Sequence, residues 1–546
     1  MIIRSCIFST LLFLVLTNHI AWAADYFVHP MKGNDANSGL SIDQAIRTLA
    51  RASQLSLLPG DRLLLAGGQR HAGSLELVGL QGHPSRPITV ATVAWPESDA
   101  NQPAFIDAKG YAQALLIRDC RYIQVDSLHI QANGYAEKRP GLDMRCGILV
   151  NTTANGRTEG IVLTNIRIQD IFHENPGYKR PPNEVMTANG SERYGWGIRL
   201  MCTDETARME NIRIERCAIE NVEHTGIKLT GAAHNISRVW LYGNRITRTG
   251  GPGIQLSNVK FVHVSANEIS YSGSADDTRK WGRGSGLWTW SASNVLIEKN
   301  RFLYANGPGD SAGAHIDFNC DNVVLQYNVS AYNAGGFCEI LGNTYNCAYR
   351  YNISVNDGHR VKGKGGAFQE GKLFWLSGYQ GDNRERKGPI NTYFYNNTIF
   401  VDQGIEAKFA IDGRSDGVLI ANNIFCIADS SLTVMGDQNK PDSPVEGGLD
   451  RVFFSNNLYL KPENWPADLP IQDKFPLFGD PDFASKGGLL PADYLPRNRK
   501  LIKDRGVKIP YLESDAIGLM QGLDVMEDIR GKVIGGIPSL GALEID

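Results

Sequence analysis

Two acidic residues, Asp317 and Glu339, occur in similar short patterns and are the strongest candidates for a chemical role. Residues 313–317 read GAHID and residues 335–339 read GGFCE, so each acid ends a glycine-led run in which side chains alternate in character. Alternate residues of a strand point to opposite faces. If the two runs are stacked neighbouring strands, both carboxyl groups lie on one outer face, one above the other.

The alternation divides the two runs into an inward set and an outward set. The predicted inward set is small or apolar and consists of Ala314, Ile316, Gly336 and Cys338. The predicted outward set consists of His315, Asp317, Phe337 and Glu339. A slip of one residue would bury both carboxylates, which supports this assignment of faces.

The expected separation of the two carboxyl groups indicates what they could do. Adjacent strands lie about 4.8 Å apart. Retaining glycosidases hold their two carboxyl groups roughly 5–5.5 Å apart, whereas inverting ones need about 6.5–9.5 Å. Two close carboxylates also raise the pKa of one of them, which supplies a protonated acid. The pattern therefore predicts a retaining pair, with Asp317→Asn and Glu339→Gln each removing most activity.

Aromatic residues lie close to this predicted pair. Trp288 and Trp290 lie one repeat earlier on the same predicted face and could form a platform for a sugar ring, although packing beneath a long loop fits them equally well. His315 is a candidate substrate-binding residue, and a hydrogen-bonded spectator is the simpler interpretation.

Basic residues suggest where an acidic substrate would bind. Lys228 and Arg360 are candidate substrate-binding residues, and residues 360–387 contain seven Lys or Arg against three acids. Arg199 and Lys228 are otherwise expected to be solvated surface residues. We therefore expect a polysaccharide or oligosaccharide substrate that is anionic if this basic segment borders the groove.

Two repeats indicate the elements that must position these residues. Glycine-led alternating strands occur at residues 197–200, 226–230, 253–257 and 286–290, before the two runs above. A second kind of strand ends in asparagine, at Asn244, Asn267, Asn300, Asn328, Asn352, Asn397, Asn423 and Asn457. Such repeats predict a solenoid of stacked coils, each built from three short strands and loops of variable length. For the asparagines we predict turns and amide ladders between coils, without a catalytic role.

Composition and the amino terminus set the compartment. The chain has 546 residues, a net charge of −3 and 42% hydrophobic residues, which argues against disorder and gives no reason to expect nucleic acid. Residues 1–23 resemble a secretory signal with a short apolar run and an Ala-Trp-Ala end. We expect a secreted or periplasmic monomer that does not associate with membranes.

The eight cysteines after residue 23 are scattered without a CxxC pair, so one or two disulfides stay open.

Both ends of the mature chain carry a resemblance to a known group. Residues 26–39 read YFVHPMKGNDANSG, residues 46–58 have helical spacing, residues 59–61 read PGD, and the end reads SLGALE. This arrangement resembles secreted right-handed parallel β-helix enzymes that act on polysaccharides, of the pectate-lyase-like kind. The resemblance implies an all-β solenoid with a helical cap at its start and an irregular cap at its end. The expected divisions are residues 24–110, 111–460 and 461–546.

The resemblance also implies the candidate functions. The pair of acids is similar to that of retaining β-helix xylosidases, which implies a glycoside hydrolase with Asp317 as nucleophile, Glu339 as acid/base and no cofactor. The alternative is a polysaccharide lyase or uronate epimerase, with Arg360, Lys362 or Lys364 as base and calcium held by Asp317, Asp321 and Glu339. A non-catalytic carbohydrate-binding β-helix is the third interpretation. The long loops at residues 172–195, 273–285 and 360–390 are expected to border the groove.

Overall fold

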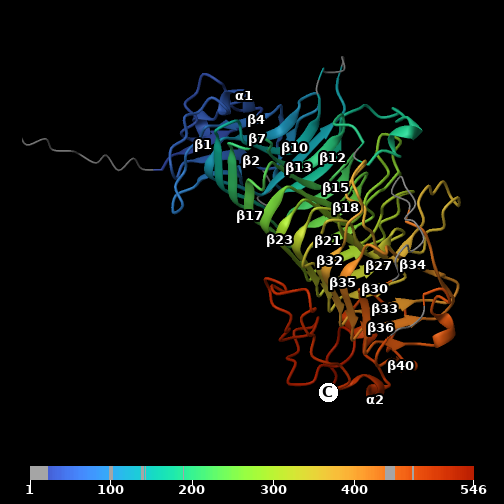
Figure 1. The fold of residues 1–546 in the computed structure, drawn as a ribbon. Helices are drawn as coiled ribbons and strands as arrows, with labels where there is room; N and C mark the ends of the chain where they lie inside the picture. Colours follow the sequence, from blue (N-terminus) through green and yellow to red (C-terminus); the bar gives the residue numbers. More distant parts are fainter. Residues whose placement is uncertain are drawn as a thin grey trace, which may run out of the picture.

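The chain forms an elongated solenoid in which the backbone winds through three sheets, coil after coil (Figure 1). The computed structural model describes residues 23–96, 102–136, 141, 143–188, 190–436, 449–469 and 473–546. Within these residues the sheets contain 14, 12 and 14 strands, and every pairing between named strands is parallel. Each strand pairs with its equivalents in the preceding and following coils, which is the arrangement of a parallel β-helix. The predicted all-β fold is confirmed.

Each sheet stacks its strands in coil order. The first sheet consists of β1 (Asp25–Val28), β2 (Arg62–Ala66), β5 (Ile88–Val93), β8 (Arg121–Asp126), β11 (Arg157–Thr164), β14 (Arg208–Glu215), β17 (Ile236–Tyr242), β20 (Val259–Ser265), β23 (Ser293–Glu298), β26 (Asp321–Gln326), β29 (Ala348–Arg350), β32 (Ile390–Tyr395), β35 (Asp416–Ala421) and β38 (Val452–Ser455). The second sheet consists of β4 (Leu75–Val78), β7 (Gln113–Arg118), β10 (Arg145–Asn151), β13 (Gly195–Cys202), β16 (Ile227–Gly231), β19 (Ile254–Ser257), β22 (Leu287–Trp290), β25 (Ala314–Ile316), β28 (Gly336–Ile340), β31 (Lys372–Leu376), β34 (Ala407–Ile411) and β37 (Ser431–Thr433). The third sheet consists of β3 (Arg70–Ala72), β6 (Ala104–Asp107), β9 (Leu128–Asn133), β12 (Arg167–Phe172), β15 (Ala218–Val222), β18 (Arg245–Thr249), β21 (Glu268–Ser270), β24 (Arg301–Leu303), β27 (Val329–Ala331), β30 (Ile353–Val355), β33 (Thr398–Val401), β36 (Ile424–Ile427), β39 (Leu458–Tyr459) and β40 (Leu477–Phe478).

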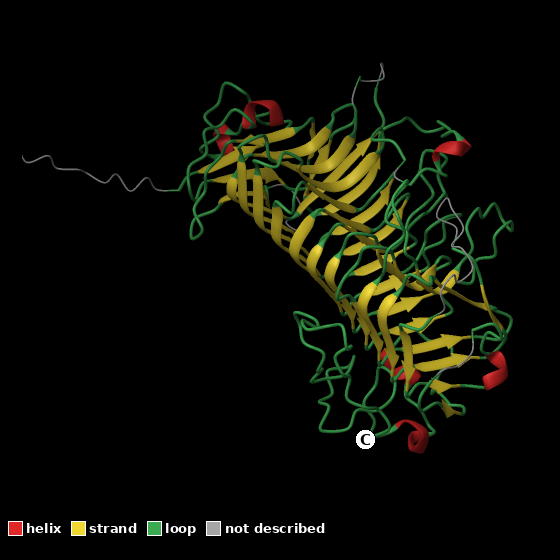
Figure 2. Cartoon of the chain, viewed as in Figure 1, coloured by secondary structure: helices red, strands yellow, loops and turns green. Residues whose placement is uncertain are grey.

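Helices are few and lie at the margins of the solenoid (Figure 2). They are α1 (Leu49–Ala52), α2 (Arg499–Ile502) and the 3-10 turns at Ile42–Gln44, Pro182–Glu184, Pro462–Asn464 and Pro491–Tyr494. The spacing over residues 46–58 predicted a longer helix than the four residues of α1. Ile46 and Leu57, near the two ends of that segment, are buried outside the helix. None of the helices in the described part of the chain is long and apolar enough to cross a membrane. The predicted signal, residues 1–23, lies outside the described residues apart from Ala23.

The inward side chains of all three sheets form one continuous core of Val, Ile and Leu along the solenoid. The asparagine repeat lies at one corner of the coils, as a ladder. Each side-chain amide donates to the amide oxygen of the next asparagine, for example Asn300 to Asn328 at 3.0 Å and Asn328 to Asn352 at 2.9 Å. The residue before each asparagine supplies the left-handed turn, such as Lys299 and Tyr327. The predicted ladder is confirmed, whereas the left-handed turn lies one residue before the asparagine that was predicted to adopt it.

The cysteines and the carboxyl-terminal tail complete the architecture. The eight described cysteines are all buried free thiols, so none of them forms a disulfide: Cys120, Cys146, Cys202, Cys217, Cys320, Cys338, Cys347 and Cys426.

Residues 507–525 of the tail return along the first sheet, where Ile509, Leu512 and Leu523 pack on Tyr393 and Tyr395. In Figure 1 the tail is the red segment beside the last coils.

Candidate active site

A cavity of about 470 Å³ lies on the outer face of the second sheet. Its floor comes from consecutive strands, with Lys228 and Thr230 on β16, Gln255 and Ser257 on β19, Trp288 and Trp290 on β22, and His315 on β25 followed by Asp317. Its walls come from loops that contribute Met186, Ala188, Arg283, Asp310, Phe318, Leu341, Phe368, Gln369 and Tyr379. Ligand sites commonly have this size and this mixture of aromatic and a few polar groups. All three loops predicted to border the groove contribute residues.

The register between β25 and β28 differs from the predicted one. Ile316 pairs with Ile340, and Ala312 forms a bridge with Gly336, so Glu339 lies opposite His315 rather than opposite Asp317. The carboxylates are therefore diagonal neighbours, one strand and two residues apart. A shift of two residues keeps both on the outer face, because the side-chain period of a strand is two. The prediction of retention rested on a single strand spacing between the two acids, and that premise was wrong.

Phe337 is also placed differently from the prediction. Its ring packs in the core against Tyr349 and Phe394, with centroids 5.6 and 6.1 Å away. The neighbouring Cys338 is likewise in the core, so the alternation is interrupted where β28 begins. Two glycines precede Phe337 and carry no side chains that would hold the predicted register.

Asp317 has the chemistry expected of an acid/base group. Burial raises the pKa of Asp317 from its ordinary value of 3.8 to about 7, and the charges of Glu339 and Asp310 act in the same direction. The backbone N–H of Phe318 donates to Oδ1 of Asp317 at 2.8 Å, which fixes the orientation of the carboxyl group. Asp317 is thus a carboxyl group that keeps its proton at mildly acidic pH while facing a cavity.

Asp310 is a second carboxylate of the cavity, and the repeats in the sequence do not point to it. Nε and Nη2 of Arg283 donate to its two oxygens at 2.8 and 3.0 Å, and this buried ion pair outweighs desolvation and lowers the pKa of Asp310. Nη1 of Arg283 also donates to the carbonyl oxygens of Met186 and Thr187, so one guanidinium joins the loops on two sides of the cavity. At mildly acidic pH Asp310 is therefore ionised, while Asp317 keeps its proton.

Glu339, the predicted partner, lies beside the cavity rather than on its surface. Its side chain is mostly buried, and Oε2 is 3.9 Å from Nδ1 of His315, which does line the cavity. Burial lowers the pKa of His315, and the hydroxyl of Ser285 lies 3.1 Å from the same Nδ1. Glu339 therefore influences the cavity residues indirectly: it lies against His315, and its negative charge raises the pKa of Asp317.

Both predicted tryptophans line the cavity, but Trp288 is only 6% exposed and lies in a cluster with Trp196 and Trp281, as the alternative of packing beneath loops predicts. Trp288 lies 5.5 Å from the ring of His315, and Trp290 meets Phe318 edge-on at 6.0 Å. Phe318 in turn meets Tyr379 edge-on at 5.7 Å. Both tryptophans line the cavity, and a loop residue extends the aromatic surface on the side of Asp317. Aromatic faces of this kind suit the apolar face of a sugar ring.

Of the two basic residues predicted to bind substrate, Lys228 lines the cavity and Arg360 does not. Arg199 and Lys228, expected to be solvated, are only 2% and 7% exposed. Glu192 of the loop at residues 172–195 pairs with Arg199, and Met186 of the same loop lines the cavity together with Lys228. Arg199 and Lys228 both lie over the ring of Trp196. Arg360 is buried outside the cavity lining, where it donates to the carbonyl oxygens of Gly307, Asp310 and Gln369.

The proposed calcium ligands do not come together. Asp321 belongs to β26 of the first sheet, where its carboxylate accepts a hydrogen bond from Ser293 at 2.7 Å. Asp317 follows β25 and Glu339 lies on β28, both strands of the second sheet. In the residues that the structure describes, no group of three or more His, Cys, Asp or Glu side chains is arranged to hold a metal ion.

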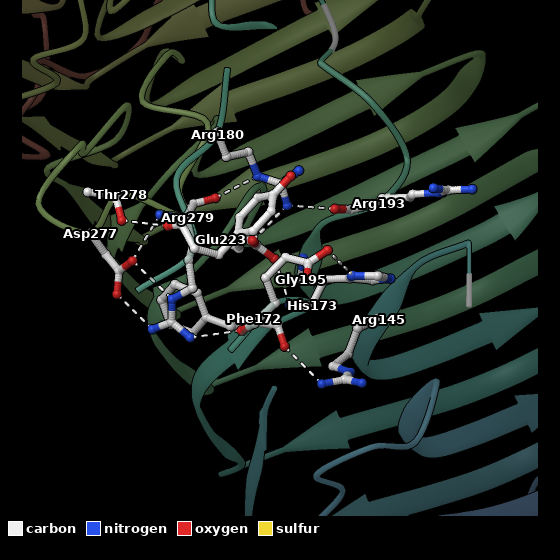
Figure 3. Close-up of polar contacts among 12 residues, drawn as sticks. Arg145, Phe172, His173, Arg180, Arg193, Gly195, Glu223, Asp277, Thr278 and Arg279 are labelled. Carbon is white, nitrogen blue, oxygen red and sulfur yellow. Dashed lines mark hydrogen bonds and ion pairs between the residues drawn. The ribbon is translucent and has the colours of Figure 1, made fainter. Parts of the chain in front are cut away.

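The covering loops are anchored by a buried ionic network (Figure 3). Glu223 is fully buried and accepts hydrogen bonds at 2.7 Å from Arg180 and from the backbone N–H groups of His173 and Gly195. Arg180 also donates to the carbonyl oxygen of Arg279, which ties the loop at residues 172–195 to the one at residues 273–285. The loops that form the cavity walls are therefore held to the solenoid through Glu223 and Arg180.

Comparisons with known proteins support this architecture. Residues 196–425 match the family model described as right handed beta helix region. The GH136 lacto-N-biosidase from Eubacterium ramulus is 20% identical, and the match covers 75% of this chain and 68% of that one with a TM-score of 0.53. The complex of XylC with xylose is 11% identical over 96% of this chain and 98% of that one, with a TM-score of 0.50.

A third solved structure, that of the PL6 family alginate lyase AlyGC, is 13% identical over 90% of this chain and 60% of that one, with a TM-score of 0.49. No curated protein shows a significant match to the sequence. At these identities the lacto-N-biosidase and the xylose complex are similar to this chain in fold alone, and the predicted resemblance to right-handed parallel β-helix proteins is confirmed at that level.

Proposed function

We propose that this protein is an exported glycoside hydrolase that cleaves a polysaccharide or oligosaccharide in the cavity on the second sheet. The observation that carries the proposal is the pair of cavity carboxyl groups whose pKa values are moved apart, with that of Asp317 raised to about 7 and that of Asp310 lowered. Pairs of this kind separate the acid from the ionised partner in glycosidases. Two solved structures of similar fold, the lacto-N-biosidase and the xylose complex, support a sugar substrate.

In this proposal Asp317 donates its proton to the departing glycosidic oxygen as the glycosidic bond breaks. Water then adds to the anomeric carbon and gives a proton to the Asp317 carboxylate, which restores the acid. Asp310, held ionised by Arg283, stabilises the positive charge that develops on the sugar ring. Glu339 adds negative charge behind His315 and raises the pKa of Asp317 further. The resemblance to retaining xylosidases implied a nucleophile at Asp317 and an acid/base at Glu339, whereas the raised pKa of Asp317 favours Asp317 as the acid. The reaction needs no cofactor.

A polysaccharide lyase is the second candidate, and Lys228 is the observation that favours it. Burial lowers the pKa of this cavity lysine to about 8, which suits a general base. The bases expected from the sequence have less support, because Arg360, Lys362 and Lys364 are not among the cavity-lining residues.

Product analysis on a panel of polysaccharides tests the proposal. A hydrolase releases new reducing ends without ultraviolet absorbance, because water is added across the broken bond. A lyase creates an unsaturated sugar that absorbs in the ultraviolet, and a carbohydrate-binding protein releases nothing. Reducing ends without absorbance are expected; an absorbing product would transfer the assignment to the lyase.

The pH dependence should report the ionisation of Asp317. Because the proton donor must be protonated in the free enzyme and its pKa is about 7, kcat/KM is expected to fall as the pH rises through about 7. Below that pH the donor is protonated and kcat/KM no longer depends on this group. The measurement is the pH profile of kcat/KM on the glycan found in the panel, and a profile that instead rises through pH 7 would assign Asp317 as the group that must be ionised.

A further inference from the structure

We propose that the end of the cavity at Lys228 is a subsite for a negatively charged substituent of the substrate, a carboxylate or a sulfate ester, on a sugar unit remote from the bond that is cleaved. This inference rests on the proposed function and adds to it the chemical class of the substrate. The feature that carries it is a buried ammonium group with unpartnered polar neighbours, at the opposite end of the cavity floor from Asp317.

The strand order fixes the distance between this subsite and the reacting group. Lys228 pairs with Gln255, Gln255 with Trp288, and Trp288 with His315, through consecutive strands β16, β19, β22 and β25. Three strand spacings separate Lys228 from His315, which is about 14 Å. The two tryptophans of β22 lie between these ends. A chain of sugar units laid along the floor would therefore meet Lys228 and Asp317 with different units.

No residue in the described part of the chain pairs with Lys228 at hydrogen-bond distance, although the charge of Glu192 acts on it from farther away. Among the described residues, no hydrogen bond or ion pair involves its ammonium group; the ring of Trp196 lies 4.7 Å from Nζ. The other cations nearby are occupied, since Arg199 pairs with Glu192 and Arg283 pairs with Asp310. Burying an unpaired charge costs free energy, and an anion bound at Lys228 would recover it.

Two further polar atoms at this end lack a partner in the described part of the chain. Oγ1 of Thr230 and Oε1 of Gln255 are buried and accept no hydrogen bond, although nearly all buried polar atoms are satisfied in folded proteins. Both side chains line the cavity next to Lys228. The hydroxyl of Thr230 can donate to an anion, and the amide oxygen of Gln255 can accept from a sugar hydroxyl. These groups complete a site for a charged sugar.

The charge of the site selects the ligand class. A lysine ammonium is a compact charge that can bind either the planar carboxylate of a uronic acid or a tetrahedral sulfate. An arginine guanidinium would instead favour anions that it can bind through two parallel hydrogen bonds. Trp288 and Trp290 supply a neighbouring apolar surface for the ring that carries the anion. A neutral sugar would leave Lys228 unpaired, so the anionic form should bind more tightly.

Binding to the full chain carrying Asp317→Asn tests the inference without turnover. The probes are an array of neutral, uronic-acid and sulfated oligosaccharides, followed by titration of the best binder and of its neutral form, the methyl ester or the desulfated sugar. We expect the best binders to be anionic and to lose roughly 10- to 100-fold in affinity on neutralisation, as for a hydrogen bond to a charged group. The uronic-acid and sulfated arms distinguish the two sources of the anion.

A second substitution in the same background assigns the effect to Lys228. Lys228→Met keeps the aliphatic stem and removes the charge, and it should abolish the preference for the anionic form, while Lys228→Arg should keep most of it. Lys109→Met, at an exposed lysine after β6, is the matched control and should change nothing. Neutral best binders, an undiminished preference in Lys228→Met, or no binding by the array would each overturn the inference.

The same variants separate this inference from the proposed function. If anionic glycans bind through Lys228 but the wild-type protein releases no reducing ends from them, the hydrolase proposal fails and the subsite stands. If anionic and neutral glycans are hydrolysed equally well and Lys228→Met leaves both rates unchanged, the subsite fails and the hydrolase stands. If Lys228→Met abolishes formation of an ultraviolet-absorbing product, Lys228 is a lyase base and both proposals fail.

Discussion

Asp317→Asn is expected to lower kcat/KM by roughly 10²–10⁴, the usual contribution of general acid–base catalysis. The amide keeps the size of the side chain and can still accept the hydrogen bond from the N–H of Phe318, but it cannot transfer a proton. The measurement is steady-state kinetics on the glycan identified by product analysis, with Asp43→Asn, an exposed acid near the amino terminus, as the matched control. Full activity of Asp317→Asn would remove this residue from the mechanism.

Thermal unfolding separates this loss from misfolding, because the sign of the stability change is fixed. The pKa of Asp317 is raised by folding from 3.8 to about 7, so its contribution to stability is complete below pH 3.8 and is lost as the pH rises through about 7. At pH 8 the wild-type protein must bury an ionised carboxylate, and the neutral amide avoids this. Asp317→Asn should therefore have a higher Tm than wild type at pH 8, and a lower one would indicate damage to the fold.

The second large effect is expected at Asp310, where Asp310→Asn should lower kcat/KM by roughly 10²–10³, as removal of a preorganised charged group does. The charge of Asp310 also raises the pKa of Asp317, so the fall of kcat/KM at high pH should move to lower pH in this variant. The shift of the limb reports the charge of Asp310, whereas the loss of kcat/KM at low pH reports its part in the reaction.

Glu339→Gln is the comparison that distinguishes the two acidic partners. It should shift the same limb in the same direction, because Glu339 also raises the pKa of Asp317, but with a smaller loss of rate since Glu339 does not line the cavity. A larger loss in Glu339→Gln than in Asp310→Asn would restore Glu339 as the catalytic partner predicted from the sequence.

The solenoid could be predicted because its signals repeat. The alternation of Ile198, Ile227 and Ile254 with polar neighbours recurs coil after coil, and the structure stacks these residues in register. The asparagine series was interpretable for the same reason, since a ladder needs one amide in every coil. A repeated pattern averages out local irregularities, so its structural meaning survives loops of unequal length.

The register at the candidate site could not be predicted from the same pattern. Alternation detects a slip of one residue, which moves every side chain to the other face, but a slip of two residues leaves the pattern unchanged. The step from β25 to β28 is such a slip, and it replaces Asp317 with His315 as the neighbour of Glu339. A stereochemical prediction from one strand spacing therefore needed more than the pattern contained.

The remaining site residues come from irregular segments. Asp310 and Arg283 lie in loops of consecutive coils without periodicity, and Arg283 also reaches Met186 in a loop far away in the sequence. Lys228 was expected to be solvated because its strand places it on the outer face, but it lies against Trp196 in a cavity that Met186 of another loop also lines. Burial of a strand residue by segments distant in the sequence cannot be recognised from the spacing of neighbouring residues.

The most direct test of glycoside hydrolysis is the origin of the oxygen in the product. The reaction is run in water enriched in heavy oxygen, the product is reduced at once to stop exchange at the reducing end, and its mass is measured. We predict that each cleavage by the wild-type protein incorporates one heavy oxygen atom at the new reducing end, and that Asp317→Asn forms little of this product. A cleavage product that contains no heavy oxygen and carries an unsaturated sugar would contradict hydrolysis.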